Sequence, residues 1–399
     1  MHYPLTPARR DAVLHGLTVI CGRRPVVVAA DGVGHDWAPV TRLVFDRELP
    51  GLGADDRAAR SIIVKTRRVD GAGHGGPAYL RREVAALRTL GRSRVAARVI
   101  LVDDEAGVVV QSDLGSRPTL EQVLLGDDRE RAASAMVEYG RAVGRLHAST
   151  LGRRLDHEAA LAEFGPADVT TGGGSGTRGT RHWSVVEDAC TDLGLPDARI
   201  ARDDLALVRS HLDDPGAYAA LVHDDLNPTN ALVTEHGVRL VDFEGSRYGH
   251  IGFDVSFLHY PFPHHSPNWS VLPVDVVDDA DRAYRDVLAE SLPVDALPAY
   301  DEMLAVGAAT ALAGRVTRLP LIASPDQPAY DSWRRRAQLV QQLGVFRRLA
   351  ARAGILPDLA HWSTELAEAM VIRWPDAGAP PPRLYPAFAG TPSAAASTG

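Results

Sequence analysis

Apolar and β-branched residues come in short runs through the first third of the chain, a pattern typical of strands. The runs lie at residues 26–28, 40–45, 62–66, 99–102 and 108–110. The turn-forming Asp-Gly-Val-Gly stretch at residues 31–34 separates the first two runs and predicts a β-hairpin there. The pattern therefore predicts a small β-rich unit in this part of the chain.

One segment within this unit has helical spacing instead. Pro77 suits a first helical position, and Leu80, Val84 and Leu87 follow at i, i+4 and i+7 on one face. We therefore expect a single helix that starts at Pro77 and packs against the strands.

Helical spacing dominates after the strands, for example over residues 136–146, where apolar residues share one face. A Gly- and Thr-rich stretch at residues 170–180 predicts a surface loop. Residues 377–399 are rich in Pro, Ala, Ser and Gly, which predicts a disordered tail.

Together these elements predict an α+β protein with two lobes. The small β-rich N-terminal lobe is expected at residues 1–113, and the larger, mainly helical C-terminal lobe at residues 114–376. A hinge is expected at residues 111–115, where the pattern changes.

A polar stretch between two short apolar strands carries the sharpest functional signal. It reads His-Asp-Asp-Leu-Asn-Pro-Thr-Asn at residues 223–230, and Val-Asp-Phe-Glu follows at residues 241–244. Phosphoryl transfer needs a carboxylate that orients the attacking hydroxyl and oxygen ligands for a metal ion. Asp225 suits the catalytic base, and Asn230 and Asp242 provide the hard oxygen atoms that Mg²⁺ prefers.

The order H-x-D-L-x-x-x-N followed by D-F is the pattern of the kinase catalytic and metal-binding loops. The plain alternative is a polar hairpin turn in which Asn227 and Pro228 supply the turn chemistry. Four polar positions in the right order, flanked by strands, favour the kinase interpretation. The sequence therefore predicts an enzyme that uses ATP and Mg²⁺.

The same template requires a strand lysine and a helix glutamate upstream. Lys65 lies in the third apolar run, and Glu83 lies on the inward face of the helix that starts at Pro77. Lys65 is expected to hold the phosphates, and Glu83 to hold the lysine. Taken singly, they would be a solvated edge-strand lysine and an exposed helix residue. Gly32 and Gly34 in the hairpin turn are candidates for phosphate contacts through their amides, although a plain turn explains them nearly as well.

At these residues the chain resembles the aminoglycoside phosphotransferase family, whose members share a protein-kinase-like two-lobe fold. Residues 223–230 are similar to that family's catalytic loop, and the following Asp-Phe-Glu to its metal-binding segment. Glu244 stands where protein kinases carry glycine, which points away from a protein kinase. The stretch at residues 109–115 is similar to the family's hinge, so the resemblance implies that Gln111 and Asp113 belong to the ATP site.

A finer resemblance involves residues 242–254, which are similar to the corresponding stretch of choline kinases and methylthioribose kinases. This resemblance implies that Asp254 braces the catalytic loop and takes no part in the chemistry. Leu146 and His147, at a helix end, are also typical of the family.

The bulk composition restricts the partners. A formal net charge of -8 argues against nucleic acid, because phosphate backbones call for a basic surface. The two cysteines, Cys21 and Cys190, lie far apart without metal-ligand spacing, so no disulfide framework is expected. No apolar run approaches the length of a membrane span and no signal-peptide pattern is present, so a cytoplasmic protein without a membrane partner is expected. The sequence does not indicate an oligomeric state.

The expected acceptor is a hydroxyl group of a small molecule bound by the C-terminal lobe. An antibiotic of the aminoglycoside or nucleoside type is the first expectation. A primary metabolite such as choline, a sugar or methylthioribose is the second. A catalytically silent nucleotide-binding protein of the same fold is the alternative of another class, although retention of the whole predicted constellation argues against it.

Three further features are interpreted as structural. The histidines within residues 259–265 are expected in an irregular loop without metal-ligand spacing. Aromatic residues within 260–269 are expected to pack beneath that loop, in preference to caging a cationic substrate. The acidic residues within 275–281 are expected at a solvated helix N-terminus.

Overall fold

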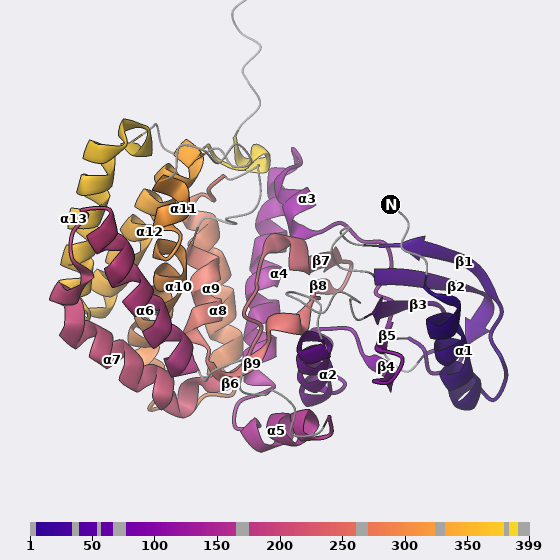
Figure 1. The fold of residues 1–399 in the computed structure, drawn as a ribbon. Coiled ribbons are helices and arrows are strands. Elements are labelled where there is room, and N and C mark those ends of the chain that lie inside the picture. Colours follow the sequence, from indigo (N-terminus) through magenta and orange to yellow (C-terminus); the bar gives the residue numbers. More distant parts are fainter. Residues whose placement is uncertain are drawn as a thin grey trace, which may run out of the picture.

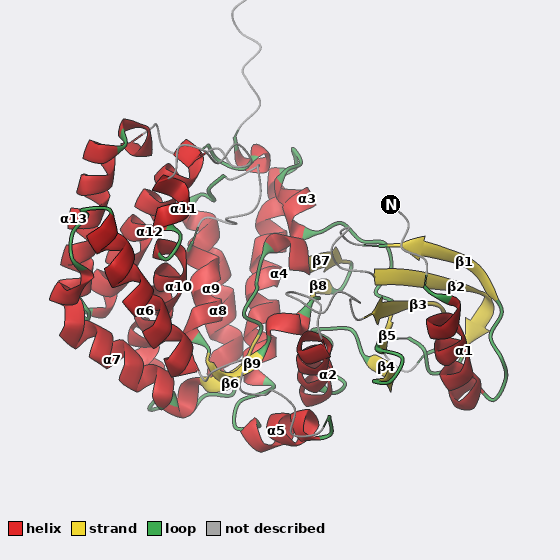
Figure 2. Cartoon of the chain, in the orientation of Figure 1, coloured by secondary structure: helices red, strands yellow, loops and turns green. Residues whose placement is uncertain are grey.

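The computed structural model describes eight stretches of the chain, which form a smaller and a larger lobe (Figure 1). These stretches are residues 5–33, 40–53, 57–66, 77–164, 175–260, 270–323, 332–378 and 383–389. The smaller lobe holds the long strands, and the larger lobe is mainly helical (Figure 2). The expected α+β, two-lobe architecture is confirmed.

One antiparallel five-stranded sheet, in the order β1-β2-β3-β5-β4, forms the small lobe. Its strands are β1 (Val27–Gly32), β2 (Val40–Leu49), β3 (Ala59–Thr66), β4 (Val99–Asp103) and β5 (Val108–Ser112). β1 and β2 form the expected hairpin. Alternation along β3 buries Ile62 and Val64 in the lobe's core and directs Lys65 to the opposite face.

An N-terminal helix that the pattern did not predict, α1 (Pro7–Cys21), covers one face of this sheet. Val13 and Leu17 of α1 are fully buried and belong to one apolar cluster with Phe45 and Val110. The expected helix at Pro77 is α2 (Pro77–Leu90), which lies at the boundary between the lobes (Figure 1).

The large lobe consists of helices and two short two-stranded sheets. Its helices are α3 (Leu120–Leu124), α4 (Arg129–Ala148), α5 (Arg154–Ala162), α6 (Ser175–Asp192), α7 (Arg202–Asp213), α8 (Gly252–His259), α9 (Val274–Ala289), α10 (Tyr300–Val316), α11 (Leu319–Ala323), α12 (Ser332–Ala353) and α13 (Pro357–Arg373). The strands β6 (Ala219–Val222) and β9 (Arg247–His250) pair with each other, as do β7 (Ala231–Thr234) and β8 (Gly237–Leu240). The β7–β8 hairpin lies on the side of this lobe that faces the sheet (Figure 1).

Glycines allow the closest helix crossing of the large lobe. A Cβ atom built on Gly307 of α10 would lie 1.9 Å from main-chain atoms of Gly252 in α8. No side chain fits in that space, so the crossing fixes α8 directly behind the loop at residues 223–230.

Part of the expected disordered tail is ordered, so that expectation is wrong there. Leu384 forms a bridge with Val271, and Tyr385, Ala387 and Phe388 are buried in the core of the large lobe. The apolar side chains bury enough surface to order a segment whose overall composition is Pro- and Ala-rich.

Two other expectations are corrected. Residues 175–180 belong to helix α6, although the Gly- and Thr-rich stretch predicted a loop there. Asp281 is buried, where a solvated position was expected, because the hydroxyl of Tyr300 donates to it at 2.6 Å and His259 Nε2 lies 3.2 Å away. Predictions for Phe262, His264, His265 and Trp269 lie outside the described residues.

None of the helices in the described part of the chain combines the length and apolar character that crossing a membrane requires.

Candidate active site

The loop after β6 is held from behind by Asp254 of α8. Its carboxylate accepts main-chain N–H bonds from His223 at 2.7 Å and from Asp224 at 3.0 Å, and His147 Nε2 lies 3.2 Å from it. Burial alone would raise the pKa of Asp254, but the hydrogen bond with His147 holds that pKa below its ordinary value. An ionised, fully buried Asp254 therefore braces the loop, as expected.

Two asparagines of the same loop orient the carboxylate of Asp225. Asn230 Nδ2 donates to Asp225 Oδ2 at 2.9 Å and to its main-chain oxygen at 3.0 Å, and Asn227 Nδ2 donates to Oδ1. Burial raises the pKa of Asp225, opposed by His223 and assisted by the negative charge of Asp242. A carboxylate with a raised pKa accepts a proton more readily, which suits a general base.

The β7–β8 hairpin brings Asn230 and Asp242 together. Asn230 lies just before β7 and Asp242 lies two residues after β8, and Val241 N donates to Asn230 O at 2.9 Å. Asp242 adopts the left-handed conformation with φ 71°, which non-glycine residues rarely take. The main chain turns sharply there, and the Asp242 carboxylate meets a side chain of the small lobe.

That side chain is Lys65, which bridges the two lobes. Lys65 Nζ donates to Glu83 Oε1 at 2.7 Å and to Asp242 Oδ1 at 2.9 Å. Burial by itself would lower the pKa of Lys65, but the two carboxylates raise it above its ordinary value. Lys65 is therefore a fixed positive charge between the lobes.

Glu244 adds a further carboxyl group beside this cluster. Burial raises its pKa to about 7, helped by the charges of Asp242, Glu83 and Asp225 and opposed by Lys65. Glu83 and Asp242 contact Lys65, and the carboxyl groups of Asp225 and Glu244 lie close enough to Asp242 to feel its charge, so acidic groups outnumber the lysine and favour a cation.

The donor atoms suit a magnesium ion. Because Asn230 Nδ2 is used on Asp225, the amide oxygen is the atom left for a cation. The carboxylate of Asp242 remains 28% exposed. No cluster of three or more His, Cys, Asp or Glu able to hold a metal occurs among the described residues. Mg²⁺ commonly takes one or two protein ligands and completes its shell with phosphate and water, so Asn230 and Asp242 fit it.

Two residues of the expected hinge have their side chains turned toward the small lobe. Gln111 Nε2 donates to Glu83 Oε1 at 3.0 Å, so its side chain supports the lysine partner. Asp113 accepts from Arg42 Nε at 2.6 Å and from the hydroxyl of Ser61 at 2.7 Å. A nucleotide contact by either residue would therefore use the main chain.

The phosphate-covering turn is only partly described. Gly32 is the last residue of β1 and pairs with Thr41 of β2, while Gly34 lies outside the described residues. A role for these two glycines stays a prediction.

Sequence reasoning missed an ion pair beside the catalytic loop. Arg247 of β9 donates from Nη2 to Asp224 Oδ1 at 3.1 Å, and Asp224 has φ 69°. The only early signal was a second aspartate in the loop. The sequence held a stronger signal for the importance of Lys65. It is the only lysine of the chain, and all the other residues counted under Lys+Arg are arginines.

Comparisons with known proteins identify the family to which the chain is similar. Residues 55–300 match the model of the phosphotransferase enzyme family, APH, and this range includes Lys65, Asp225 and Asp242. A search of curated proteins finds no match. Among solved structures, a choline kinase from Cryptosporidium parvum matches with 13% identity and a TM-score of 0.47, over 85% of this chain and 93% of that one.

Two further structures match similarly. An ethanolamine kinase from Plasmodium vivax has 12% identity and a TM-score of 0.48, over 80% of this chain and 84% of that one. The gentamicin complex of APH(2")-IIa has 11% identity and a TM-score of 0.44, over 86% of this chain and 96% of that one.

Proposed function

Because this chain belongs to the phosphotransferase enzyme family, we propose that it moves the γ-phosphoryl group of ATP onto a hydroxyl group of a small molecule. Membership makes the chain a small-molecule phosphotransferase. The observation that carries the proposal is the contact of Lys65 with both Glu83 and Asp242. It joins Lys65 to a residue 177 positions away in the other lobe, in the arrangement that phosphoryl transfer needs.

In the proposed mechanism, each charged residue has one task. Lys65 holds the ATP phosphates, and Glu83 keeps the lysine in place. Asn230 and Asp242 would hold Mg²⁺, which would neutralise negative charge on the phosphates. These tasks require little covalent chemistry from the protein and depend on accurate positioning.

Asp225 is the proposed base. It accepts the proton of the acceptor hydroxyl while that oxygen forms a bond to the γ-phosphorus. The bond from the γ-phosphorus to the bridging oxygen breaks, and ADP leaves with its electron pair. Asn227 and Asn230 hold the Asp225 carboxylate in place throughout.

An antibiotic is the acceptor class that we propose, and side chains next to the catalytic loop favour the nucleoside type over the aminoglycoside type. The guanidinium of Arg247, bound to Asp224, lies 5.7 Å from the ring centre of Phe253. Phe253 packs on Phe257. The guanidinium of Arg315 lies 5.9 Å from the ring centre of Phe257. Apolar aromatic rings suit a neutral, planar ring system, which can stack on them, better than a strongly hydrated polycation.

The alternative acceptor is a primary metabolite. Choline, a sugar and methylthioribose are the metabolite candidates. The alternative of another class is a catalytically silent nucleotide-binding protein.

A panel assay separates these possibilities. The purified chain is incubated with Mg-ATP and nucleoside antibiotics, aminoglycosides, choline, sugars or methylthioribose, and phosphoryl mass gain is measured. Phosphorylation of a nucleoside antibiotic is expected. Transfer only to aminoglycosides or metabolites would overturn the acceptor class, whereas Mg-ATP binding without any turnover would favour the silent protein.

A further inference from the structure

Helix α5 of the large lobe packs against α2, the helix that carries Glu83 (Figure 1). Its contacts reach the last turn of α2. Arg153, just before α5, donates from Nη1 to the main-chain oxygen of Thr89. Glu163, just after α5, pairs with Arg88. The first contact satisfies a carbonyl that the end of a helix leaves without an intrahelical partner, and it places positive charge at the negative end of the helix dipole.

A buried hydrogen bond between Thr89 and His157 completes this contact. Thr89 Oγ1 lies 2.7 Å from Ala85 O and 3.2 Å from His157 Nδ1, and both side chains are almost fully buried. A carbonyl only accepts, so the single hydroxyl proton of Thr89 goes to Ala85. His157 Nδ1 must therefore carry the proton that it donates to Thr89.

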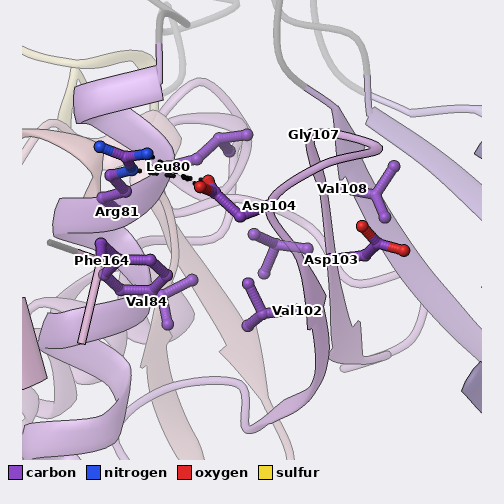
Figure 3. Close-up of a pocket in the computed structure, with 10 residues that line it drawn as sticks. Leu80, Arg81, Val84, Val102, Asp103, Asp104, Gly107, Val108 and Phe164 are labelled. Carbon is purple, nitrogen blue, oxygen red and sulfur yellow. Dashed lines mark hydrogen bonds and ion pairs between the residues drawn. The ribbon is translucent and has the colours of Figure 1, made fainter.

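Phe164 extends the contact along α2 toward the sheet. It forms one wall of a narrow cavity, and Figure 3 shows its ring beside Val84 and Arg81 of α2, with Val102 of β4 opposite. The guanidinium groups of Arg81 and Arg88 lie 5.9 and 5.7 Å from the ring centre of Phe164. The cavity does not include Lys65, so it lies apart from the proposed site of chemistry.

The N-terminal half of α2 is held by the large lobe as well. Arg82 Nε donates to the main-chain oxygen of Glu244 at 3.0 Å. Glu83, one residue along, is 1% exposed and contacts Lys65 and Gln111. The large lobe therefore binds α2 on both sides of the residue that positions Lys65.

We infer that α5 clamps α2 to the large lobe, so that Arg153, His157 and Phe164 are positioning residues for Glu83 and, through it, Lys65. The clamp as a structural device follows from the contacts alone, while its consequence for nucleotide binding rests on the proposed function. Loss of the clamp lets α2 move away, which weakens the Lys65–Glu83 pair and exposes the amine.

The reactivity of Lys65, the only lysine of the chain, tests this inference without any phosphoryl acceptor. His157→Leu removes the donor to Thr89, whereas His157→Asn keeps a nitrogen donor near the position of Nδ1. Each protein is treated with an amine-acylating reagent, and peptide mapping follows modification at Lys65. We expect His157→Leu to acylate about 10-fold faster than the natural protein, because pairing and burial suppress amine reactivity, and His157→Asn to restore the slow rate.

Hydrogen exchange and nucleotide binding supply two independent readouts. In His157→Leu we expect faster exchange in α2 and about 5-fold weaker binding of Mg-ADP, which is the change that one buried hydrogen bond of about 1 kcal/mol supports. The matched control is Glu158→Gln, the exposed neighbour of His157, which should behave like the natural protein. Thr89→Val is the milder variant if His157→Leu does not fold.

The outcomes are distinguishable. Unchanged Lys65 acylation and unchanged α2 exchange in folded His157→Leu and Thr89→Val overturn the clamp and leave the kinase proposal intact. If the natural protein does not bind Mg-ADP, the proposed function fails, and the acylation rates still decide the clamp.

Discussion

Two neighbouring aspartates of the catalytic loop have separate tasks. Asp225 is oriented by asparagine side chains and has a raised pKa, which suits proton transfer. Asp224 pairs with Arg247 in β9 and so ties the loop to the strand that follows Asp242. In the proposed mechanism Asp225 therefore supports the chemistry, while Asp224, the residue before it, supports the shape of the loop.

Asp225→Asn tests the assignment of the base. The amide has nearly the same size but accepts no proton, so we expect phosphoryl transfer to fall by a factor of about 10² to 10⁴. Mg-ADP affinity, measured by calorimetry, should stay within about twofold. Full transfer activity in this variant would contradict the assignment.

Asp224 is in the left-handed conformation, and a pair of substitutions separates backbone strain from the ion pair. Asp224→Gly and Asp224→Ala both remove the contact with Arg247, but only alanine bears the steric cost of φ 69°. We expect alanine to lower the free energy of unfolding by about 1 kcal/mol more than glycine, measured by urea denaturation. The reverse order would show that the loop relaxes to another conformation.

Single residues were the part of the site best predicted from the sequence, where a motif fixed both identity and order. Lys65, Glu83 and Asp242 do lie together, because each occupies a set position on a strand, helix or turn. The side-chain directions of Gln111 and Asp113 were not predictable, since they depend on partners far along the chain.

Among the elements, the crossing of α8 and α10 controls the position of Asp254. The close approach of Gly252 and Gly307 leaves no space for side-chain atoms. Alternation and helical spacing predicted most strands and α2, because they report which face is buried. The same signal is weak in α1, whose burial is limited to Val13, Leu14 and Leu17, and this explains why α1 was missed.

Two glycine-to-alanine substitutions, one at the crossing and one away from it, test its importance for stability. Gly307→Ala should lower the free energy of unfolding by about 2 kcal/mol or more, because α8 and α10 must separate to admit the methyl group. The control is Gly344→Ala in α12, where the nearest atom to the new methyl group is 3.8 Å away. That substitution should be neutral or stabilise the helix by up to about 1 kcal/mol. Equal effects would show that the crossing has room to adjust.

For the whole molecule, buried neutral histidines make stability depend on pH. Burial lowers the pKa of His157 to about 4 and that of His250 to about 3. In the unfolded chain both titrate near the ordinary value of about 6.5. Between these values the unfolded chain binds more protons than the folded protein, so the contribution to stability is complete above about pH 6.5 and is lost as the pH falls.

His157→Asn, which keeps a donor to Thr89 but cannot titrate, tests this linkage. From pH 6 to pH 4.5 the free energy of unfolding of the natural protein should fall more steeply than that of the variant, by up to about 1.4 kcal/mol per pH unit. Urea denaturation at several pH values measures both slopes. Parallel slopes would show that His157 is protonated in the folded protein.

The contacts of Asp113 affect how the two lobes can move relative to each other. Arg42 of the small lobe donates hydrogen bonds to Asp113 and to Ser116, so the small lobe contacts the connecting chain as far as Ser116. The large lobe contacts the residues that follow immediately, because Arg117 pairs with Glu235 and Pro118 O accepts from Val233 N. Few residues of the connecting chain lie between these two sets of contacts, so we expect the lobes to move relative to each other mainly by rotation about the chain next to Ser116.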